Sequence, residues 1–216
     1  MELYFVRHGK TEWNLEGKYQ GGHGDSPLLP ESLHDITLLA KRLKNIKISH
    51  MYSSPLPRAK TTAETLIKDL HEKIPFTIVD DLREFDLGIM EGRKFSELEE
   101  EMPEVIYAFR HQPADYDYSL IRGESFEQVA DRTTKAVKKI VAENNDQDNI
   151  VIVSHGAALV TLIQSLLGTE VADIRKNGGL SNTSLTHLQY DNGQFKLIKW
   201  NETGYLNKKL ESSDTI

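Results

Sequence analysis

Two histidines stand in the same local setting, each directly after an apolar run and directly before a glycine. His8 follows Leu-Tyr-Phe-Val-Arg, and His155 follows Ile-Val-Ile-Val-Ser. Both runs predict buried strands, so both imidazoles should emerge where a strand ends, the place where ligands bind in an open α/β sheet. A neutral imidazole is a competent nucleophile near neutral pH. The pair predicts a nucleophile and a stabiliser of negative charge in one site; the alternative for each is a histidine satisfied by hydrogen bonds.

Two arginines are placed where they can hold an anion. Arg7 precedes the first of these histidines and offers planar, paired donors that suit phosphate oxygens. Arg58 falls in the first turn of a predicted helix, where the backbone already favours anions and a cation is poorly placed. A negative group should therefore compensate Arg58, and the alternative to a bound anion is a local carboxylate such as Glu64.

An acidic segment at residues 82–92 mixes carboxyl groups with apolar side chains. Its sequence is Leu-Arg-Glu-Phe-Asp-Leu-Gly-Ile-Met-Glu-Gly, which contains Glu84, Asp86 and Glu91. A buried carboxyl group keeps its proton more readily than an exposed one, and that property suits a general acid. For Asp86 and Glu91 the simpler expectation is a solvated acidic loop.

Composition narrows the function classes. The 216 residues are 38% hydrophobic and 27% charged, without cysteine, and carry a formal charge of −7. This excludes disulfides and thiolate metal sites, and the negative charge argues against nucleic-acid binding. No signal peptide and no apolar run of about 20 residues are found, so we expect a cytoplasmic protein without a membrane partner. No His-x-His or Glu-x-x-His spacing supports a metal site.

Strand-like and helix-like patterns alternate along the chain, separated by charged or glycine-rich loops at residues 8–30 and 80–93. The polar tail after Asn201 is expected to fray. Strands are predicted at 2–7, 48–53, 76–79, 149–153, 184–190 and 194–200, and helices at 31–45, 56–70, 125–143 and 157–167, with weaker helical patterning at 95–110.

This order predicts one α/β domain over residues 1–216, with three layers (α/β/α). The sheet should be mostly parallel with an antiparallel edge strand, because the last two strands form a hairpin around Asp-Asn-Gly. Residues 94–123, which are irregular after residue 111, form a candidate cap over the site. The exposed edge of the terminal hairpin would permit a homodimer.

Four spaced motifs resemble the histidine phosphatase superfamily, which also contains the cofactor-dependent phosphoglycerate mutases. They occur in family order over nearly the whole chain: Arg7-His8-Gly9-Lys10-Thr11-Glu12-Trp13-Asn14, Ser53-Ser54-Pro55-Leu56-Pro57-Arg58-Ala59, Glu84 before Asp-Leu-Gly, and Ser154-His155-Gly156. The resemblance implies a phosphoglycerate mutase-like fold and phosphoryl transfer with neither a metal nor another cofactor.

The resemblance also implies roles for single residues. His8 would be the nucleophile that becomes phosphohistidine, and Glu84 the proton donor to the leaving oxygen. Arg7, Arg58 and a protonated His155 would hold the phosphoryl oxygens, whose charge must be stabilised during transfer. Further contacts to phosphate or substrate are implied at four positions: Asn14, Gln20, Gly21 and Gly156.

The stretch after Glu84 bears on the reaction. Phe-Asp-Leu-Gly-Ile-Met-Glu-Gly resembles the phosphatase branch of the family, whereas mutases typically carry His/Tyr-Gly and Leu-x-Gly-Leu there. The chain is also shorter than a typical mutase. We therefore expect a phosphomonoester hydrolase acting on small phosphorylated metabolites. The alternatives are a cofactor-dependent phosphoglycerate mutase and a non-catalytic module that binds phosphorylated ligands.

Overall fold

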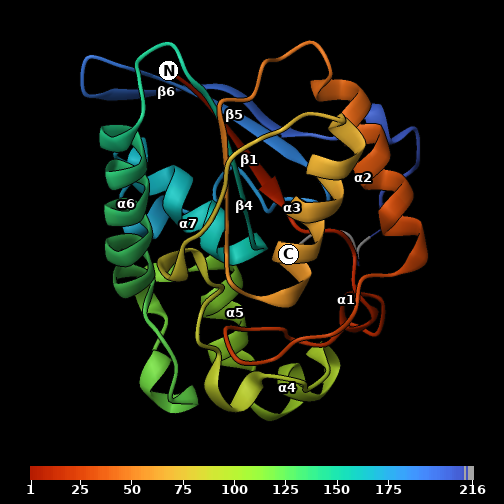
Figure 1. Cartoon of the computed structure of the whole chain (residues 1–216). Helices are drawn as coiled ribbons and strands as arrows, with labels where there is room; N and C mark the ends of the chain where they lie inside the picture. The colour runs from red at the N-terminus through yellow and green to blue at the C-terminus, as the bar shows by residue number, and fades with distance from the viewer. Residues whose placement is uncertain (212, 214–216) are drawn as a thin grey trace.

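A computed structural model describes residues 1–211 and 213, and its middle layer is a six-stranded sheet (Figure 1). The strand order is β3-β2-β4-β1-β5-β6, in which β1 to β4 run parallel and β5 is antiparallel to both β1 and β6. The predicted α/β domain with an antiparallel edge is confirmed. The strands are β1 Glu2–Arg7, β2 His50–Ser53, β3 Phe76–Ile78, β4 Asn149–Ser154, β5 Leu185–Asp191 and β6 Gln194–Glu202.

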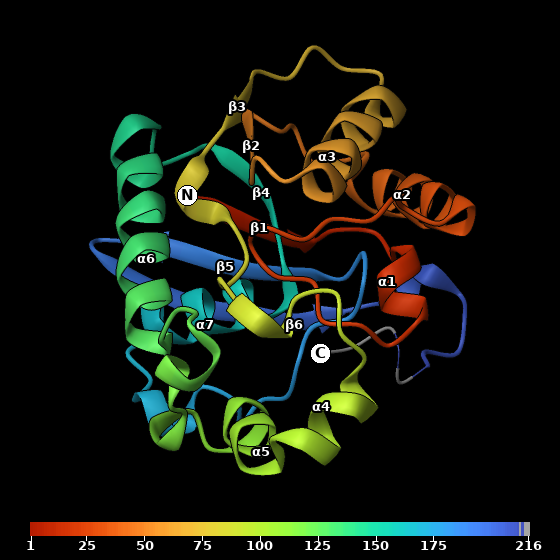
Figure 2. The same ribbon diagram turned by 90° about the horizontal axis from the view of Figure 1, so that it is seen from below.

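Two pairs of helices cover the two faces of the sheet (Figure 2). Successive strand residues point to opposite faces, so Phe5 and Ile152 pack with the apolar sides of α6 and α7, whereas Val6 and Val153 pack with α2 and α3. The sheet is therefore buried on both sides over its central strands. The helices are α2 Pro30–Leu43, α3 Pro57–Leu70, α6 Phe126–Glu143 and α7 Gly156–Leu166.

The register of β1 and β4 sets the place of both histidines. These neighbouring parallel strands pair Arg7 with Ser154 at their last positions. His8 and His155 are the next residues of each strand, so both leave the sheet at the same edge and side by side. The two runs that end in His-Gly therefore meet in one site at the carboxyl ends of the two central strands.

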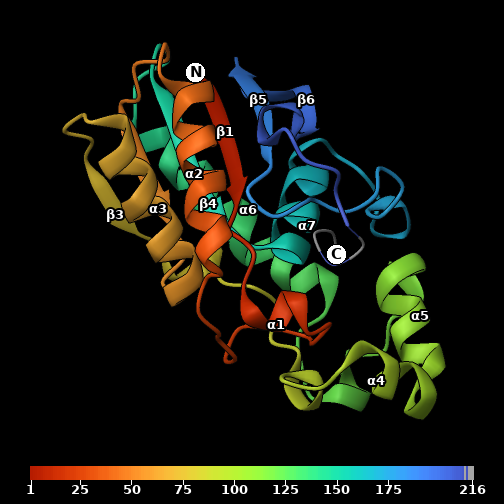
Figure 3. The same cartoon turned by 90° about the vertical axis from the view of Figure 1, so that its right-hand side faces the viewer.

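A small helical layer lies beyond this edge of the sheet (Figure 3). It contains α4 Phe95–Glu101 and α5 Pro103–His111, and Pro103 begins the second helix because proline is tolerated only in a first turn. Phe109 packs edge to face on Phe85 at 5.6 Å between ring centroids, which joins this layer to the core. The segment expected to be irregular forms two 3-10 turns, Pro113–Asp115 and Tyr118–Ile121.

Two local predictions are wrong. The loop of residues 8–30 contains a short helix, α1 Glu12–Leu15, which begins at a capping box formed by Thr11 and Asn14. The chain after Asn201 does not simply fray: Gly204–Leu206 is a 3-10 turn, Leu206 is buried, and Lys208 Nζ lies 2.6 Å from Asp35 Oδ2. The remainder of that prediction concerns residues 212 and 214–216, which lie outside the described residues.

The terminal hairpin leaves β6 at one edge of the sheet, with Ile198 exposed, so the homodimer stays a prediction. Among residues 1–211 and 213, none of the helices combines the length and the apolar character needed to cross a membrane.

Candidate active site

His8 is buried at the end of β1 as a neutral imidazole with a defined tautomer. Its Nδ1 lies 2.7 Å from the carbonyl oxygen of Gly9. A carbonyl only accepts hydrogen bonds, so Nδ1 carries the proton and Nε2 keeps its lone pair. Burial, followed by the charges of Arg58 and Arg7, lowers the pKa of His8 well below 6.5. The side chain is therefore prepared as a nucleophile at neutral pH.

His155 lies against His8, with 5.2 Å between the two ring centroids. Its Nε2 is 2.7 Å from Ser54 Oγ, while its Nδ1 is buried and has no hydrogen-bond partner within the described part of the chain. Burial and then the charge of Arg58 lower the pKa of His155 well below 6.5. The neutral ring is favoured in the protein by itself, whereas a phosphate dianion beside the ring would favour protonation, so the protonated His155 stays a prediction for the complex with substrate.

Arg7 reaches the same edge from β1 and is fully buried. Its Nη1 donates to the carbonyl oxygen of Leu180 at 2.6 Å. Its Nε lies 3.2 Å from the position that a Cβ would take at Gly156, the first residue of α7. A side chain at position 156 would crowd this guanidinium, which explains why glycine follows the second histidine.

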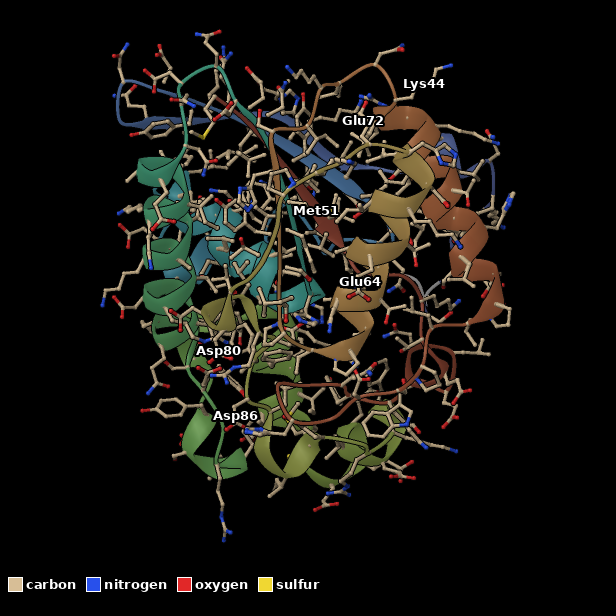
Figure 4. All side chains as sticks on the ribbon, viewed as in Figure 1. Lys44, Met51, Glu64, Glu72, Asp80 and Asp86 are labelled. Carbon is tan, nitrogen blue, oxygen red and sulfur yellow. The ribbon has the colours of Figure 1, made fainter. Side chains whose placement is uncertain are left out.

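Arg58 is the second residue of α3, directly after Pro57, and is also buried. The negative group that compensates it is Asp25, whose Oδ1 lies 2.9 Å from Arg58 Nη1. Glu64 is not the partner: it pairs with Lys60 on α3, where Figure 4 labels it. Arg58 Nη2 donates to the carbonyl of Gly21 at 3.0 Å, and its Nε is buried without a partner among the described residues.

Glu84 joins the site at the N-terminus of α7. Its carboxyl group is buried and accepts hydrogen bonds from the backbone N–H groups of Ala157 at 3.0 Å and Ala158 at 2.7 Å. A helix N-terminus has unpaired N–H groups that favour an anion. The carboxyl group is therefore fixed one residue beyond the His155-Gly156 turn, and its charge acts on Arg58 by opposing the lowering of the arginine pKa through burial.

Asn14 and Gln20, two further residues implied by the resemblance, both bind Thr11. Its Oγ1 donates to Gln20 Oε1 at 2.8 Å, and its backbone N–H donates to Asn14 Oδ1 at 3.1 Å. Gly21 lies beside Arg58, as described above, and a Cβ at Gly21 would collide with the carboxyl group of Glu91. The structure thus brings all nine residues singled out in the sequence to one end of the sheet.

Arg132, which the sequence analysis did not single out, fixes the loop that contains Glu84. Arg132 on α6 donates to the carbonyl oxygens of Arg83 and Glu84 at 2.9 and 3.0 Å. It also pairs with Glu124 at 2.8 Å, and Glu124 in turn accepts the N–H of Asp86 at 2.9 Å. In the sequence Arg132 is one charge on the polar side of an amphipathic helix, so no pattern distinguishes it.

A second missed element is the polar segment before β5. Asn182 Nδ2 donates to the carbonyl oxygen of His8 and to Asn14 Oδ1, both at 3.2 Å. The N–H of Thr183 donates to the carbonyls of Arg7 and His8 at 3.1 and 3.2 Å, and Thr183 has φ +57°. A β-branched residue in the left-handed region is strained, so surrounding contacts must hold it. In the sequence, the polar run Ser-Asn-Thr-Ser could have indicated that this segment contributes to the site.

Asp86 and Glu91, expected as a solvated acidic loop, instead connect loops. Glu91 Oε2 accepts N–H groups from His23 and Gly24, and Asp86 Oδ1 accepts the N–H of Gly88 at 2.9 Å. Figure 4 labels Asp86 at the lower end of the molecule, towards α5. With His23 these carboxylates are the one group of potential metal ligands within residues 1–211 and 213. Backbone N–H groups already donate to both oxygens of Glu91 and to Oδ1 of Asp86.

Known proteins resemble this chain in both sequence and fold. A curated relative, the probable phosphoglycerate mutase GpmB of Salmonella paratyphi A, is 32% identical over 202 residues, which cover 93% of this chain and 90% of that protein. The structure of YhfR from Bacillus stearothermophilus superposes with a TM-score of 0.88 at 32% identity, covering 95% of this chain and 99% of YhfR.

Two further solved structures are named as phosphatases. A mycobacterial glucosyl-3-phosphoglycerate phosphatase complexed with VO3 is 27% identical, with a TM-score of 0.84, and covers 94% of this chain and 99% of its own. Phosphoserine phosphatase of Entamoeba histolytica in complex with 3-phosphoglyceric acid is 29% identical, with a TM-score of 0.80 and coverage of 95% and 98%.

The family profile matches residues 3–203, which include all the residues that form this end of the sheet. The resemblance carried by four short motifs therefore extends over nearly the whole chain, in both sequence and fold. This chain belongs to the histidine phosphatase superfamily, branch 1.

Proposed function

We propose that this protein hydrolyses phosphomonoesters of small metabolites through a phosphohistidine intermediate at His8. The observation that carries the proposal is the state of this side chain. It is a buried, neutral imidazole whose Nδ1 is engaged by Gly9, beside His155 and under the charges of Arg58 and Arg7. The solved phosphatases with the same fold support hydrolysis as the reaction.

The first step transfers the phosphoryl group to the enzyme. Arg7, Arg58 and His155 hold the phosphoryl oxygens, and His8 Nε2 attacks phosphorus. The phosphorus–nitrogen bond forms as the bond to the leaving oxygen breaks. Glu84 in its protonated form gives that oxygen its proton and becomes the carboxylate that the N–H groups at the start of α7 stabilise. Charge spread over the three equatorial oxygens is stabilised by guanidinium donors that are positioned before the reaction.

The second step returns the enzyme to its starting state. Water attacks the phosphohistidine, Glu84 accepts the proton of that water, and inorganic phosphate leaves with His8 neutral again. No step in this scheme needs a metal ion, because the charge is balanced by side chains of the chain itself. We expect phosphate release to be unchanged by a chelator, and loss of activity that added divalent metal restores would contradict this part of the proposal.

Phosphoglycerate mutase activity is the second candidate, because the curated relative carries that name as probable. The two reactions share the phosphohistidine and differ in its acceptor, which is water in one case and a phosphoglycerate in the other. Incubation with 3-phosphoglycerate and 2,3-bisphosphoglycerate separates them. We expect phosphate release to exceed formation of 2-phosphoglycerate; rapid interconversion that exceeds phosphate release would establish the mutase.

We further propose that residues 94–123 form a cap over the leaving-group side of the site. Helices α4 and α5 lie beyond the carboxyl ends of β1 and β4 (Figure 1), and Phe109 packs on Phe85, the residue after Glu84. Turnover of a panel of phosphomonoesters with differently sized alcohols tests the whole proposal. Absence of phosphate release from every ester would favour the non-catalytic binding module.

A further inference from the structure

A cavity of about 630 Å³ lies between the cap and the loop that follows α7. Four separate segments line it: residues 15–19 of the N-terminal loop, the cap, residues 175–179, and Ser213 near the C-terminus. Tyr19 and Phe95 form aromatic walls, while Gly178 and Gly179 add no side chain. The volume is that of a small-molecule site.

Arg175 is the unusual residue of this cavity. Its guanidinium lies over the rings of Phe109 and Phe126, at 5.1 and 5.8 Å from the ring centroids. Its Nε and Nη2 are buried and have no hydrogen-bond partner among the described residues. These two nitrogens share one edge of the guanidinium, the fork that matches the two oxygens of a carboxylate. A buried donor without an acceptor is costly, so this fork calls for an anion.

The other charges that line the cavity are already paired. Arg110 lies over the Phe95 ring at 5.0 Å and forms an ion pair with Glu99. Glu16 pairs with Lys18 at 2.5 Å. Of the arginine and lysine side chains that line this cavity within residues 1–211 and 213, Arg175 alone has no carboxylate partner.

Arg175 is connected to the Glu84 loop through the two rings that it covers, because Phe109 and Phe126 pack on Phe85 at 5.6 and 5.0 Å between ring centroids. The proposed proton donor to the leaving oxygen therefore precedes the ring on which both of these aromatic side chains pack. Burial lowers the pKa of Arg175 to about 10, and the charge of Glu84 opposes this lowering. A group bound by Arg175 would be part of the alcohol that leaves, not part of the phosphoryl group.

We propose that Arg175 is a specificity-determining residue that binds a carboxylate on the leaving group, so that the preferred substrates are small phosphomonoesters of hydroxy acids. One unpaired cation with a planar fork matches one planar carboxylate. A second phosphate, with nearly two negative charges, would exceed the charge available here. This inference rests on the proposed hydrolase function for its place in the reaction, whereas binding tests it independently.

The experiment compares two esters of the same length, 3-phosphoglycerate and glycerol 3-phosphate, which differ in a carboxylate against a hydroxymethyl group. We expect the wild type to favour 3-phosphoglycerate in kcat/KM, and Arg175→Gln to lower kcat/KM for that ester by about 10- to 100-fold, as for loss of a hydrogen bond to a charged group. Turnover of glycerol 3-phosphate should stay within about twofold, since it makes no such contact.

Two variants serve as controls. Lys176→Gln removes the neighbouring exposed cation, which pairs with Asp173, and should leave the preference unchanged. Arg175→Lys keeps the charge but not the fork, so it should restore part of the preference.

A wild type without the preference, or an Arg175→Gln variant that loses both esters equally, would overturn the inference. If the wild type hydrolyses neither ester, the panel of phosphomonoesters described above decides the proposed function. Calorimetric binding of the same two esters to the wild type and to Arg175→Gln then decides the role of Arg175. Tighter binding of 3-phosphoglycerate that this variant abolishes supports the role, and equal binding contradicts it.

Discussion

The site around His8, here called the phosphate end, and the cavity that contains Arg175 are built differently. At the phosphate end, buried polar side chains from β1, β4 and two helix N-termini are tied to one another and to the backbone: Arg58 has Asp25, and His155 has Ser54. In the cap cavity, by contrast, Arg175 touches aromatic faces and has an unpartnered edge. In the proposed function, rigid elements thus position the groups that react, whereas a layer of short helices and loops would select the alcohol.

The largest contrast should come from a single histidine. His8→Ala removes the nucleophile, and we expect phosphate release to fall by about 10⁴-fold or more, because no covalent intermediate can form. His23→Ala is the matched control, since it changes an exposed histidine of the neighbouring loop and should alter turnover by less than about twofold. Steady-state phosphate release measures both variants. If His8→Ala retains turnover, His8 is not the nucleophile.

Glu84 lies between the two regions, and its substitution tests whether it donates the proton to the leaving oxygen. Glu84→Gln should reduce turnover of alkyl phosphates by about 10²- to 10⁴-fold, the usual range for loss of a general acid, and that of nitrophenyl phosphate far less. A nitrophenolate leaves without a proton, so only the alkyl esters need the acid. Asp81→Asn, at an exposed acid of the same loop, is the control. Equal losses on the two ester types would exclude Glu84 as the proton donor.

A smaller effect is expected at Arg132, which holds the Glu84 loop without touching substrate. Arg132→Gln should slow alkyl phosphates by about tenfold through misplacement of the acid, again with little effect on nitrophenyl phosphate. Lys135→Gln on the same helix is the control, because that lysine is exposed and pairs with Asp131, one turn away on the helix. A uniform loss over both ester types would indicate that Arg132 acts through general stability.

The smallest effect is on stability. His8 and His155 have lowered pKa values in the fold, whereas an unfolded histidine titrates near 6.5. Above pH 6.5 neither state takes up the proton. Below it the unfolded state does and the folded state does not, so the free energy of unfolding falls by about 1.4 kcal/mol per pH unit for each histidine.

Urea unfolding between pH 7.5 and 5.5 measures this slope. We expect His8→Gln to make the slope shallower and Arg175→Gln to leave it unchanged, since only the phosphate end contains these buried imidazoles. Inorganic phosphate should also reduce the slope of the wild type. A slope that is the same in wild type and His8→Gln would show that the imidazole does not resist protonation in the fold.

Much of the phosphate end was predictable because local pattern places it. Apolar runs identified β1 and β4, and the residue after each run was necessarily at the sheet edge. The partners of those residues were not predictable, since Asp25 for Arg58 and Arg132 for the Glu84 loop meet only in the tertiary structure. The four residues of α1 are too few to show a helical period.

The cap was harder to predict for a physical reason. Its short helices and 3-10 turns depend on aromatic contacts such as Phe85 with Phe109, which join distant segments. Arg175 lies in a polar stretch of the sequence that resembles an ordinary exposed loop, and only the fold reveals that aromatic rings cover its guanidinium.

The most direct test of the account is to trap the covalent intermediate. Wild-type protein is mixed with 3-phosphoglycerate, quenched in alkali within milliseconds, digested and analysed by mass spectrometry. We predict one phosphoryl group on the peptide that contains His8, lost on mild acid treatment as a phosphoramidate should be. Phosphate release accompanied by a phosphoryl group on a different residue, or by none at any point of the time course, would contradict the account.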